Sequence, residues 1–143
     1  MIRARREILL AALLASGLAA LWPPAFPLAQ ERKLSAAEIK DALIGNTVQG
    51  LWQGRSYLQF FDGSGNTFYS EEGRSASLGK WWVDDEDDTY CSTREGGRSV
   101  CYEVHDGGRG AIFWVVPHSS KKFPATVLQG NHLPAAGQAD PIF

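Results

Sequence analysis

The sequence predicts an all-β fold, an eight-stranded antiparallel meander that closes as a barrel or folds as a sandwich, with one short helix in front of it. Two features predict this fold. From residue 47 onward, β-branched and aromatic runs alternate with clusters of Gly, Asp, Asn and Ser, as in strands joined by turns. Pairs of adjacent aromatic residues recur within these runs. We expect strands at residues 47–53, 55–61, 66–71, 76–83, 88–93, 98–104, 110–116 and 123–129.

The aromatic pairs indicate that both faces of the sheet are partly apolar. Neighbouring residues on a strand point to opposite faces, so each pair sends one ring to each side. The four pairs are Phe60-Phe61, Phe68-Tyr69, Trp81-Trp82 and Phe113-Trp114. A helix or a second sheet that covers the outer rings is the simpler explanation, and an exposed aromatic patch for a ligand or partner is the alternative. The candidate residues for such a binding patch are Trp81, Trp82, Trp114 and Ile112.

A capping box predicts the helix. Ser35 and Glu38 have the spacing at which a hydroxyl and a carboxylate satisfy free amide groups at a helix start. Ala36, Ile39 and Leu43 then form one apolar stripe, and Gly45-Asn46 ends it. We therefore expect a helix over residues 36–44.

The first 29 residues have the pattern of a secretory signal peptide. Arg3, Arg5 and Arg6 precede an apolar run of about fourteen residues, which is short of the roughly 20 that span a bilayer. A small-residue boundary follows at Ala29. We expect export to the periplasm or secretion, by the general or the twin-arginine route, with no membrane span after cleavage.

Removal of residues 1–29 leaves one domain over residues 30–130 and a loose Pro- and Ala-rich tail over residues 131–143. The peptide carries three Arg and one Glu, so 11 basic and 15 acidic residues remain and the net charge is −4. Nucleic-acid binding needs a basic stripe that neutralises phosphates. The charge pattern has no such stripe and argues against a nucleic-acid partner.

The two cysteines, Cys91 and Cys101, favour a disulfide over a metal pair. An oxidising compartment stabilises the bond, and metal sites usually have four ligands. To place the cysteines opposite each other, the hairpin needs a three-residue turn, Glu95-Gly96-Gly97. That register sets Arg94 against Arg98, which costs only tenths of a kcal/mol, whereas the bond contributes about 3 kcal/mol.

The next hairpin is expected to turn at Gly107-Gly108, so that Tyr102 faces Phe113 and Asp106 faces Arg109. This register also sets Val104 opposite Ala111 and Cys101 opposite Trp114. The residues expected to face the core are Tyr102, Val104, Ala111, Phe113 and Val115. Those expected on the other face are Cys101, Glu103, His105, Ile112, Trp114 and Val116.

No motif in the chain predicts catalysis or a cofactor. The acidic run at residues 84–88 lacks the alternate spacing and the glycine of a calcium loop, and residues 62–66 lack further acidic ligands, so both are interpreted as turns. His105, His118 and His132 have no close metal-ligand spacing. Neither a Gly-x-Ser-x-Gly elbow nor a Gly-x-Gly-x-x-Gly loop is present. We expect no enzyme activity, no metal and no cofactor.

Two further patterns resemble known proteins. Gly50-Leu51-Trp52 and Gly79-Lys80-Trp81 match the Gly-x-Trp of lipocalin-like barrels, in which the tryptophan on the first strand plugs the closed end. The order of the segments 34–39, 45–47, 62–63, 79–82, Cys91 and Cys101-Tyr102 resembles a family of small exported proteobacterial proteins of unknown function. The resemblance covers roughly residues 34–130. It implies a secreted β domain with a structural disulfide and transfers no catalytic residue.

The leading hypothesis is a non-enzymatic module that binds a small apolar ligand or a protein partner. A protease-inhibitor-like barrel and an enzyme with an unrecognised site are the alternatives. Ligand binding predicts an apolar cavity lined by aromatic residues. Protease inhibition predicts a filled barrel with a rigid exposed segment. Catalysis predicts a cleft in which ionisable groups converge.

Overall fold

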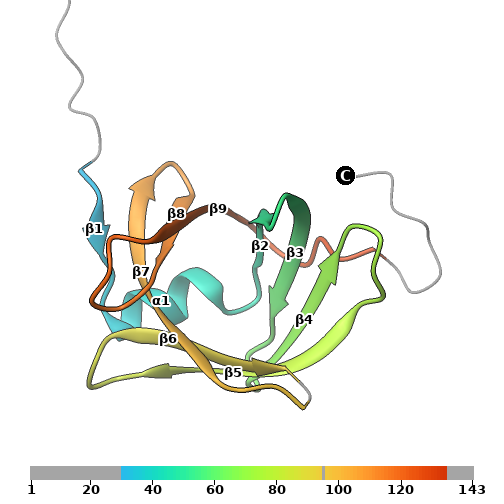
Figure 1. The fold of residues 1–143 in the computed structure, drawn as a ribbon. Helices are drawn as coiled ribbons and strands as arrows, with labels where there is room; N and C mark the ends of the chain where they lie inside the picture. Colours follow the sequence, from blue (N-terminus) through green and yellow to red (C-terminus); the bar gives the residue numbers. More distant parts are fainter. Residues whose placement is uncertain (1–29, 95, 135–143) are drawn as a thin grey trace, which may run out of the picture.

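Eight antiparallel strands close into a barrel in the computed structural model, which describes residues 30–94 and 96–134 (Figure 1). Each barrel strand pairs with the next along the chain, and β9 pairs with β2 to close the ring. A short extra strand, β1, pairs with the end of β7. The strands are β1 (Arg32–Lys33), β2 (Thr47–Trp52), β3 (Arg55–Phe61), β4 (Asn66–Glu71), β5 (Ser77–Asp84), β6 (Thr89–Arg94), β7 (Val100–Gly108), β8 (Ala111–Val115) and β9 (Lys122–Leu128). The predicted all-β meander is confirmed, and it forms a barrel.

All eight predicted strands are present. The boundaries agree closely except on β7, which begins two residues later than expected and runs on through Gly108. The predicted signal peptide, residues 1–29, and most of the predicted tail, residues 135–143, lie outside the described residues.

The helix forms where the capping box predicts it and spans Ala36–Leu43 as α1. The Ser35 hydroxyl accepts a hydrogen bond from the Glu38 amide, and the Glu38 carboxylate accepts one from the Ser35 amide. Ile39 and Leu43 have no exposed surface. The apolar stripe is therefore the face that α1 buries in the barrel.

Helix α1 closes one end of the barrel. Ile39 and Leu43 belong to the same hydrophobic cluster as Val48, Phe61, Trp81 and Val104. Just after the helix, the Gly45 amide donates to the Phe61 carbonyl at the end of β3 (2.8 Å). Neighbouring strands are antiparallel, so β2, β4 and β6 begin at this end. The opposite end of the barrel is formed by the turns at residues 53–54, 72–76, 96–99 and 116–121.

The disulfide joins β6 and β7 in the predicted register. Cys91 pairs with Cys101 across the ladder, and their sulfurs are bonded. The turn, however, is longer than the predicted three residues, because the β6–β7 pairing stops at Ser92 and Val100. The predicted Arg94–Arg98 pair does not form. Instead, Arg94 pairs with Gly79 of β5, and its carbonyl accepts a hydrogen bond from the Gly97 amide (2.8 Å).

The β7–β8 hairpin turns two residues later than predicted. Arg109 and Gly110 occupy the turn, both with positive φ (55° and 80°), and the ladder shifts between Asp106 and Gly108. Gly107 lies in this bulge, and a Cβ added to it would come within 2.9 Å of the Phe113 ring. The pairs that form are Val104 with Trp114, His105 with Phe113 and Asp106 with Ile112.

This register corrects the predicted faces of β8. Val104 is fully buried and Tyr102 packs against the core, as expected for β7. On β8 the order is reversed: Ile112 and Trp114 belong to the buried core cluster, whereas Phe113 stacks under the exposed Lys122 amine (4.6 Å to the ring centroid). Ala111 and Val115 lie on the same face as Phe113 because they alternate with the inward residues, although Val115 is itself buried.

Each aromatic pair places one ring inside the barrel and one outside. Phe61, Tyr69, Trp81 and Trp114 are buried. The outer rings of Phe68 and Trp82 are 37% and 42% exposed, so the expected covering layer does not cover them. Helix α1 lies inside the barrel end and leaves the outer face open at these positions.

Candidate functional site

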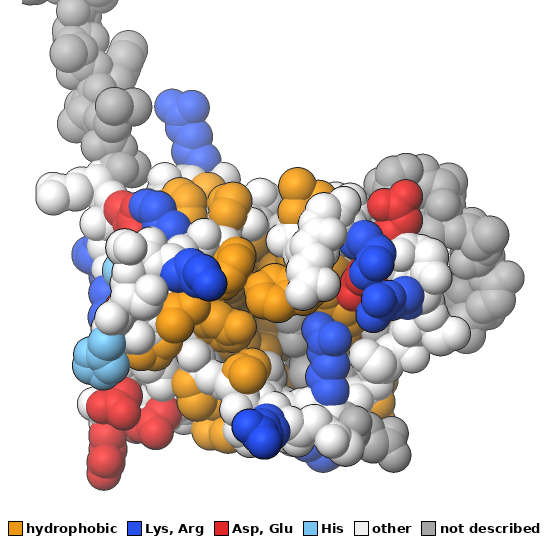
Figure 2. Space-filling model, in the orientation of Figure 1, with side chains coloured by type: hydrophobic (Ala, Val, Ile, Leu, Met, Phe, Trp, Pro, Cys, Tyr) orange, Lys and Arg blue, Asp and Glu red, His pale blue; other side chains and the backbone are white. Residues whose placement is uncertain are grey.

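The barrel is hollow at the end away from α1. A cavity of about 300 Å³ lies there, at the lower end of the range of roughly 300–1,000 Å³ typical of small-molecule sites. Figure 2 shows hydrophobic side chains gathered in the centre of this view, with Lys and Arg side chains beside them. The aromatic residues that line the cavity are Trp52, Tyr57, Tyr69, Tyr90, Tyr102, Trp114 and Phe123.

Two glycines allow close packing in the wall of the barrel. Gly50 has the Tyr57 ring directly over it, and a Cβ at this position would lie 2.8 Å from that ring. Gly79, which lines the cavity, lies so close to the Thr93 carbonyl that an added Cβ would be 2.6 Å from it. Because neither glycine has a side chain, the Tyr57 ring and the β6 backbone can approach these positions closely.

The buried polar groups of the wall bond to one another. The Gln59 amide donates to the Tyr90 hydroxyl (3.0 Å) and to the Thr67 hydroxyl (2.9 Å). The Trp114 indole N–H donates to the Tyr57 hydroxyl (3.0 Å). Burial raises the pKa of Tyr90 to about 12 and also raises that of Tyr57, so both phenols stay neutral at physiological pH. These groups fix the shape of the wall and supply uncharged hydrogen-bonding edges.

Charged side chains surround the open end. Glu71 is buried and accepts hydrogen bonds from Arg55 (2.8 Å) and from the Tyr69 hydroxyl (3.3 Å), with Arg74 at 3.5 Å. The hydrogen bond from Arg55 is the main cause that lowers the pKa of Glu71, which therefore stays ionised. Arg94 stacks on the Tyr69 ring, with its guanidinium carbon 3.8 Å from the ring centroid. The apolar cavity thus opens at a rim rich in arginine.

The four predicted patch residues do not share an exposed face. Trp81, Trp114 and Ile112 are buried inside the barrel, whereas Trp82 lies outside, next to Cys91 on the strand ladder. Trp81 and Trp114 do come together indirectly, because both pack on the Tyr90 ring, at 6.4 and 4.8 Å between centroids. Of the predicted set, only Trp114 lines the cavity.

The Gly-x-Trp segment on the first barrel strand does not lie at the closed end, where the lipocalin-like pattern would place it. Trp52, on the first barrel strand, lies at the open end and packs on Phe123 (5.1 Å between centroids). Trp81, from the second segment, lies near the end closed by α1, and its indole N–H donates to the Asp62 carbonyl (3.1 Å). The lipocalin-like plug position is therefore filled from β5, not from β2.

Most residues that line the cavity were not singled out in the sequence. Alternation along β3 could have found Tyr57 and Gln59, because they share the parity of the buried Phe61. Arg94 carries no comparable signal, since a charged residue beside a turn is usually a solvated surface residue.

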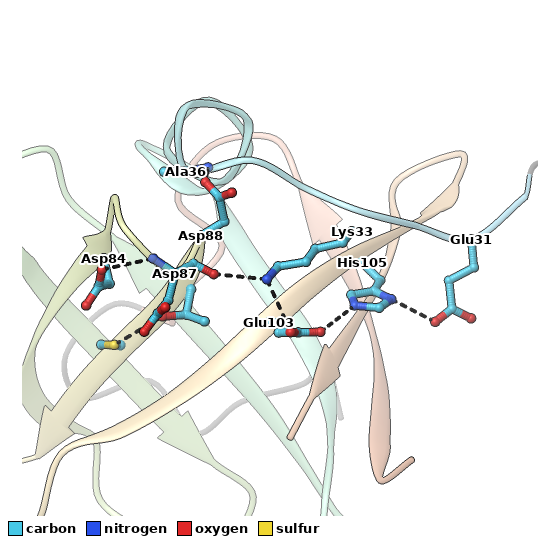
Figure 3. A network of polar contacts seen from close by, with 10 residues as sticks. Glu31, Lys33, Ala36, Asp84, Asp87, Asp88, Glu103 and His105 are labelled. Atoms are coloured by element: carbon cyan, nitrogen blue, oxygen red, sulfur yellow. Dashed lines mark hydrogen bonds and ion pairs between the residues drawn. The ribbon is translucent and has the colours of Figure 1, made fainter. Parts of the chain in front are cut away.

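The acidic run at residues 84–88 is tied to the helix and to β1 (Figure 3). The Asp88 carboxylate accepts a hydrogen bond from the Ala36 amide at the start of α1 (2.6 Å). Lys40 pairs with Asp85, and the Lys33 amine donates to the Asp87 carbonyl (2.7 and 2.9 Å). The run therefore anchors the N-terminal segment to the closed end of the barrel.

His105 belongs to the same chain of polar contacts. Its two ring nitrogens lie 3.1 Å from Glu31 and 3.0 Å from Glu103, and Glu103 also pairs with Lys33 (3.2 Å). These contacts bind β1 to β7, as Figure 3 shows. Within residues 30–94 and 96–134, no group of three or more His, Cys, Asp or Glu side chains is placed to hold a metal ion.

Millimolar calcium is expected to leave the melting temperature nearly unchanged. Only a ligand that binds the native state raises it by mass action, and Asp85 and Asp88 already have protein partners. Differential scanning fluorimetry with and without calcium, on wild type and on Asp85→Asn, measures this. A rise of several degrees in wild type that is absent in the variant would show that the run binds calcium.

Comparisons with protein-family models, with curated proteins and with solved structures gave no match to this chain. The resemblance to a family of small exported proteins stays a prediction. In the part of the chain that the structure describes, no helix has the length and apolar character needed to cross a membrane.

Proposed function

We propose that this protein is an exported, non-enzymatic binding module that takes a small apolar, ring-containing molecule into the open end of its barrel. The observation that carries the proposal is the cavity of about 300 Å³ with seven aromatic residues in its wall. Aromatic walls with few, fixed polar groups are typical of small-molecule sites. The disulfide between Cys91 and Cys101 is compatible with an extracellular location, because such bonds persist in oxidising compartments. We therefore propose that the protein acts in the periplasm or outside the cell.

The wall chemistry favours binding over catalysis. The phenols of Tyr57 and Tyr90 are held neutral by burial, and their hydroxyls are bonded to Trp114 and Gln59. Such groups orient a ligand and exchange no proton near neutral pH. A protease-inhibitor-like barrel would have a filled interior, whereas this interior is open at one end.

A neutral fluorescent probe, N-phenylnaphthylamine, is expected to bind one molecule per barrel, with a blue-shifted and enhanced emission. Ser77 points into the cavity from β5, and the adjacent Leu78 is 49% exposed on the outer face. Ser77→Phe fills part of the hollow and should lower probe affinity at least about tenfold, which corresponds to roughly 1.4 kcal/mol.

Leu78→Phe is the matched control, because it adds the same ring to the same strand on the other face. Fluorescence titration and calorimetry on both variants measure affinity and stoichiometry. Equal affinity in wild type, Ser77→Phe and Leu78→Phe would mean that the probe binds elsewhere. Failure of wild type to bind both this probe and its sulfonated analogue, anilinonaphthalene sulfonate, would contradict the proposal.

A further inference from the structure

Beyond an apolar ligand, the open end of the barrel has the chemistry to select one that carries an anionic group. We infer that the ligand is a small aromatic or apolar anion, such as a ring-bearing carboxylate or sulfonate, with its rings in the cavity and its charge at Arg94 and Arg98. This inference rests on the proposed binding function and adds the class of ligand.

Two arginines, Arg94 and Arg98, lie at the opening of the cavity. Both line the cavity at the end of β6 and in the turn that follows it. Arg94 is held on the Tyr69 ring at 3.8 Å, and Tyr69 stacks on Tyr57 at 5.3 Å between centroids. A guanidinium therefore lies at the outer end of a series of rings that leads into the barrel.

Basic side chains outnumber acidic ones among the described residues at the open end of the barrel. The residues that line the cavity and the hollow beside it include three arginines, Arg74, Arg94 and Arg98, and one carboxylate, Glu71. Glu71 already pairs with Arg74 and with Arg55. Among the described residues, Arg94 and Arg98 have no carboxylate partner within ion-pair distance. An excess of positive charge is thus left among the described residues at the opening, although residues 30–143 together have a net charge of −4.

An aromatic anion matches both the arginines at the opening and the rings in the cavity. Arg94 and Arg98 are exposed at the opening, and a guanidinium forms two parallel hydrogen bonds to a carboxylate or a sulfonate. Rings that enter the cavity would stack on the tyrosines beneath Arg94. A molecule with both parts satisfies both features of the site at once, whereas a neutral ligand would leave the two arginines without a counter-charge.

The test compares two probes that share the same rings. Anilinonaphthalene sulfonate differs from N-phenylnaphthylamine by its sulfonate, so the ratio of their affinities reports the effect of that group, and the salt dependence of the ratio reports its charge. On the exported, disulfide-bonded protein we expect the sulfonate to bind about tenfold more tightly than the neutral probe, at one molecule per barrel by calorimetry. Added salt should reduce this ratio, because it screens charges near the surface.

Variants assign the charge to the rim. Arg94→Gln and Arg98→Gln should each lower the affinity for the sulfonate about five- to tenfold more than they lower the affinity for the neutral probe. Arg109→Gln, in the turn at the opposite end of the barrel, is the matched control and should change neither. Because Arg98 lies outside the strands, its variant tests the rim even if Arg94→Gln lowers stability.

The outcomes separate the two proposals. Equal affinity for the two probes in wild type, or the same loss of both probes in the Arg98→Gln variant, would overturn the anion inference and leave the binding function intact. Failure of both probes to bind wild type would overturn the binding function, and the anion inference with it.

Discussion

Phe61→Ala is expected to lower the free energy of unfolding by about 3 to 5 kcal/mol. The Phe61 side chain has no exposed surface, and its ring packs edge-on against Trp81 and Tyr90, at 5.3 and 5.7 Å between centroids. Truncation would leave a void between α1 and the middle of the barrel. Because hydrogen bonds hold the surrounding strands in place, the wall cannot collapse to fill it. Denaturant unfolding monitored by circular dichroism measures the change.

Phe68→Ala is the control for this experiment, because it removes the same ring from the outer face of the neighbouring strand. Phe68 is 37% exposed, so a loss of about 1 kcal/mol or less is expected. Equal losses in the two variants would mean that the interior of the barrel is not the main source of its stability.

Loss of the disulfide is expected to lower the free energy of unfolding by about 2 to 4 kcal/mol in Cys101→Ser. Cys91 and Cys101 close a short loop, and the bond restricts the unfolded chain more than the folded one. The native hairpin keeps its ladder hydrogen bonds, so the variant should still fold and lose stability mainly by this route. Urea unfolding of wild type and variant, both without reductant, gives the difference.

The double variant, Cys91→Ser with Cys101→Ser, controls for the free thiol that the single variant leaves behind. It should lose about as much stability as Cys101→Ser does, and reduced wild type should match both. Two reactive thiols in denatured, unreduced wild type would contradict the bond itself. A negligible loss in the double variant would show that the bond restricts the unfolded chain little.

The strands could be predicted because their turns are marked. Clusters such as Asp62-Gly63 and Glu72-Gly73 interrupt the β-branched and aromatic runs, and seven of the eight predicted barrel strands begin within one residue of the observed position. The helix could be predicted for a similar reason, since its capping residues form local hydrogen bonds. Local chemistry was sufficient for both.

The β7–β8 register could not be predicted because the turn residues are atypical. A two-residue turn with positive φ at both positions favours Gly or Asn at the first of them, and here that residue is Arg109. The apparent turn at Gly107-Gly108 is a bulge, in which the Asp106 carboxylate accepts a hydrogen bond from the Gly108 amide (2.8 Å). The bulge changes the pairing by one residue, and that change reverses which face of β8 enters the core.

The binding cavity depends on features that lie far apart in the sequence. Its lining comes from all eight strands β2 to β9, and α1 fills one end of the barrel and leaves the other open. Arg94 becomes part of the opening through its pairing with Gly79, a contact between strands that no single segment reveals. The fold class could therefore be predicted from local sequence patterns. The cavity could not, because its lining residues come together only when the barrel closes.

The closure of β9 onto β2 has a consequence for how the chain folds. Every other pairing within the barrel joins consecutive strands, whereas Thr47 must meet Leu128 from the far end of the domain. Because the entropy lost in closing a loop grows with its length, this contact should form late and limit the folding rate. Until it forms, β2 and β9 are open edges that can pair with another chain. The chain is therefore most prone to aggregate between the synthesis of β9 and its pairing with β2.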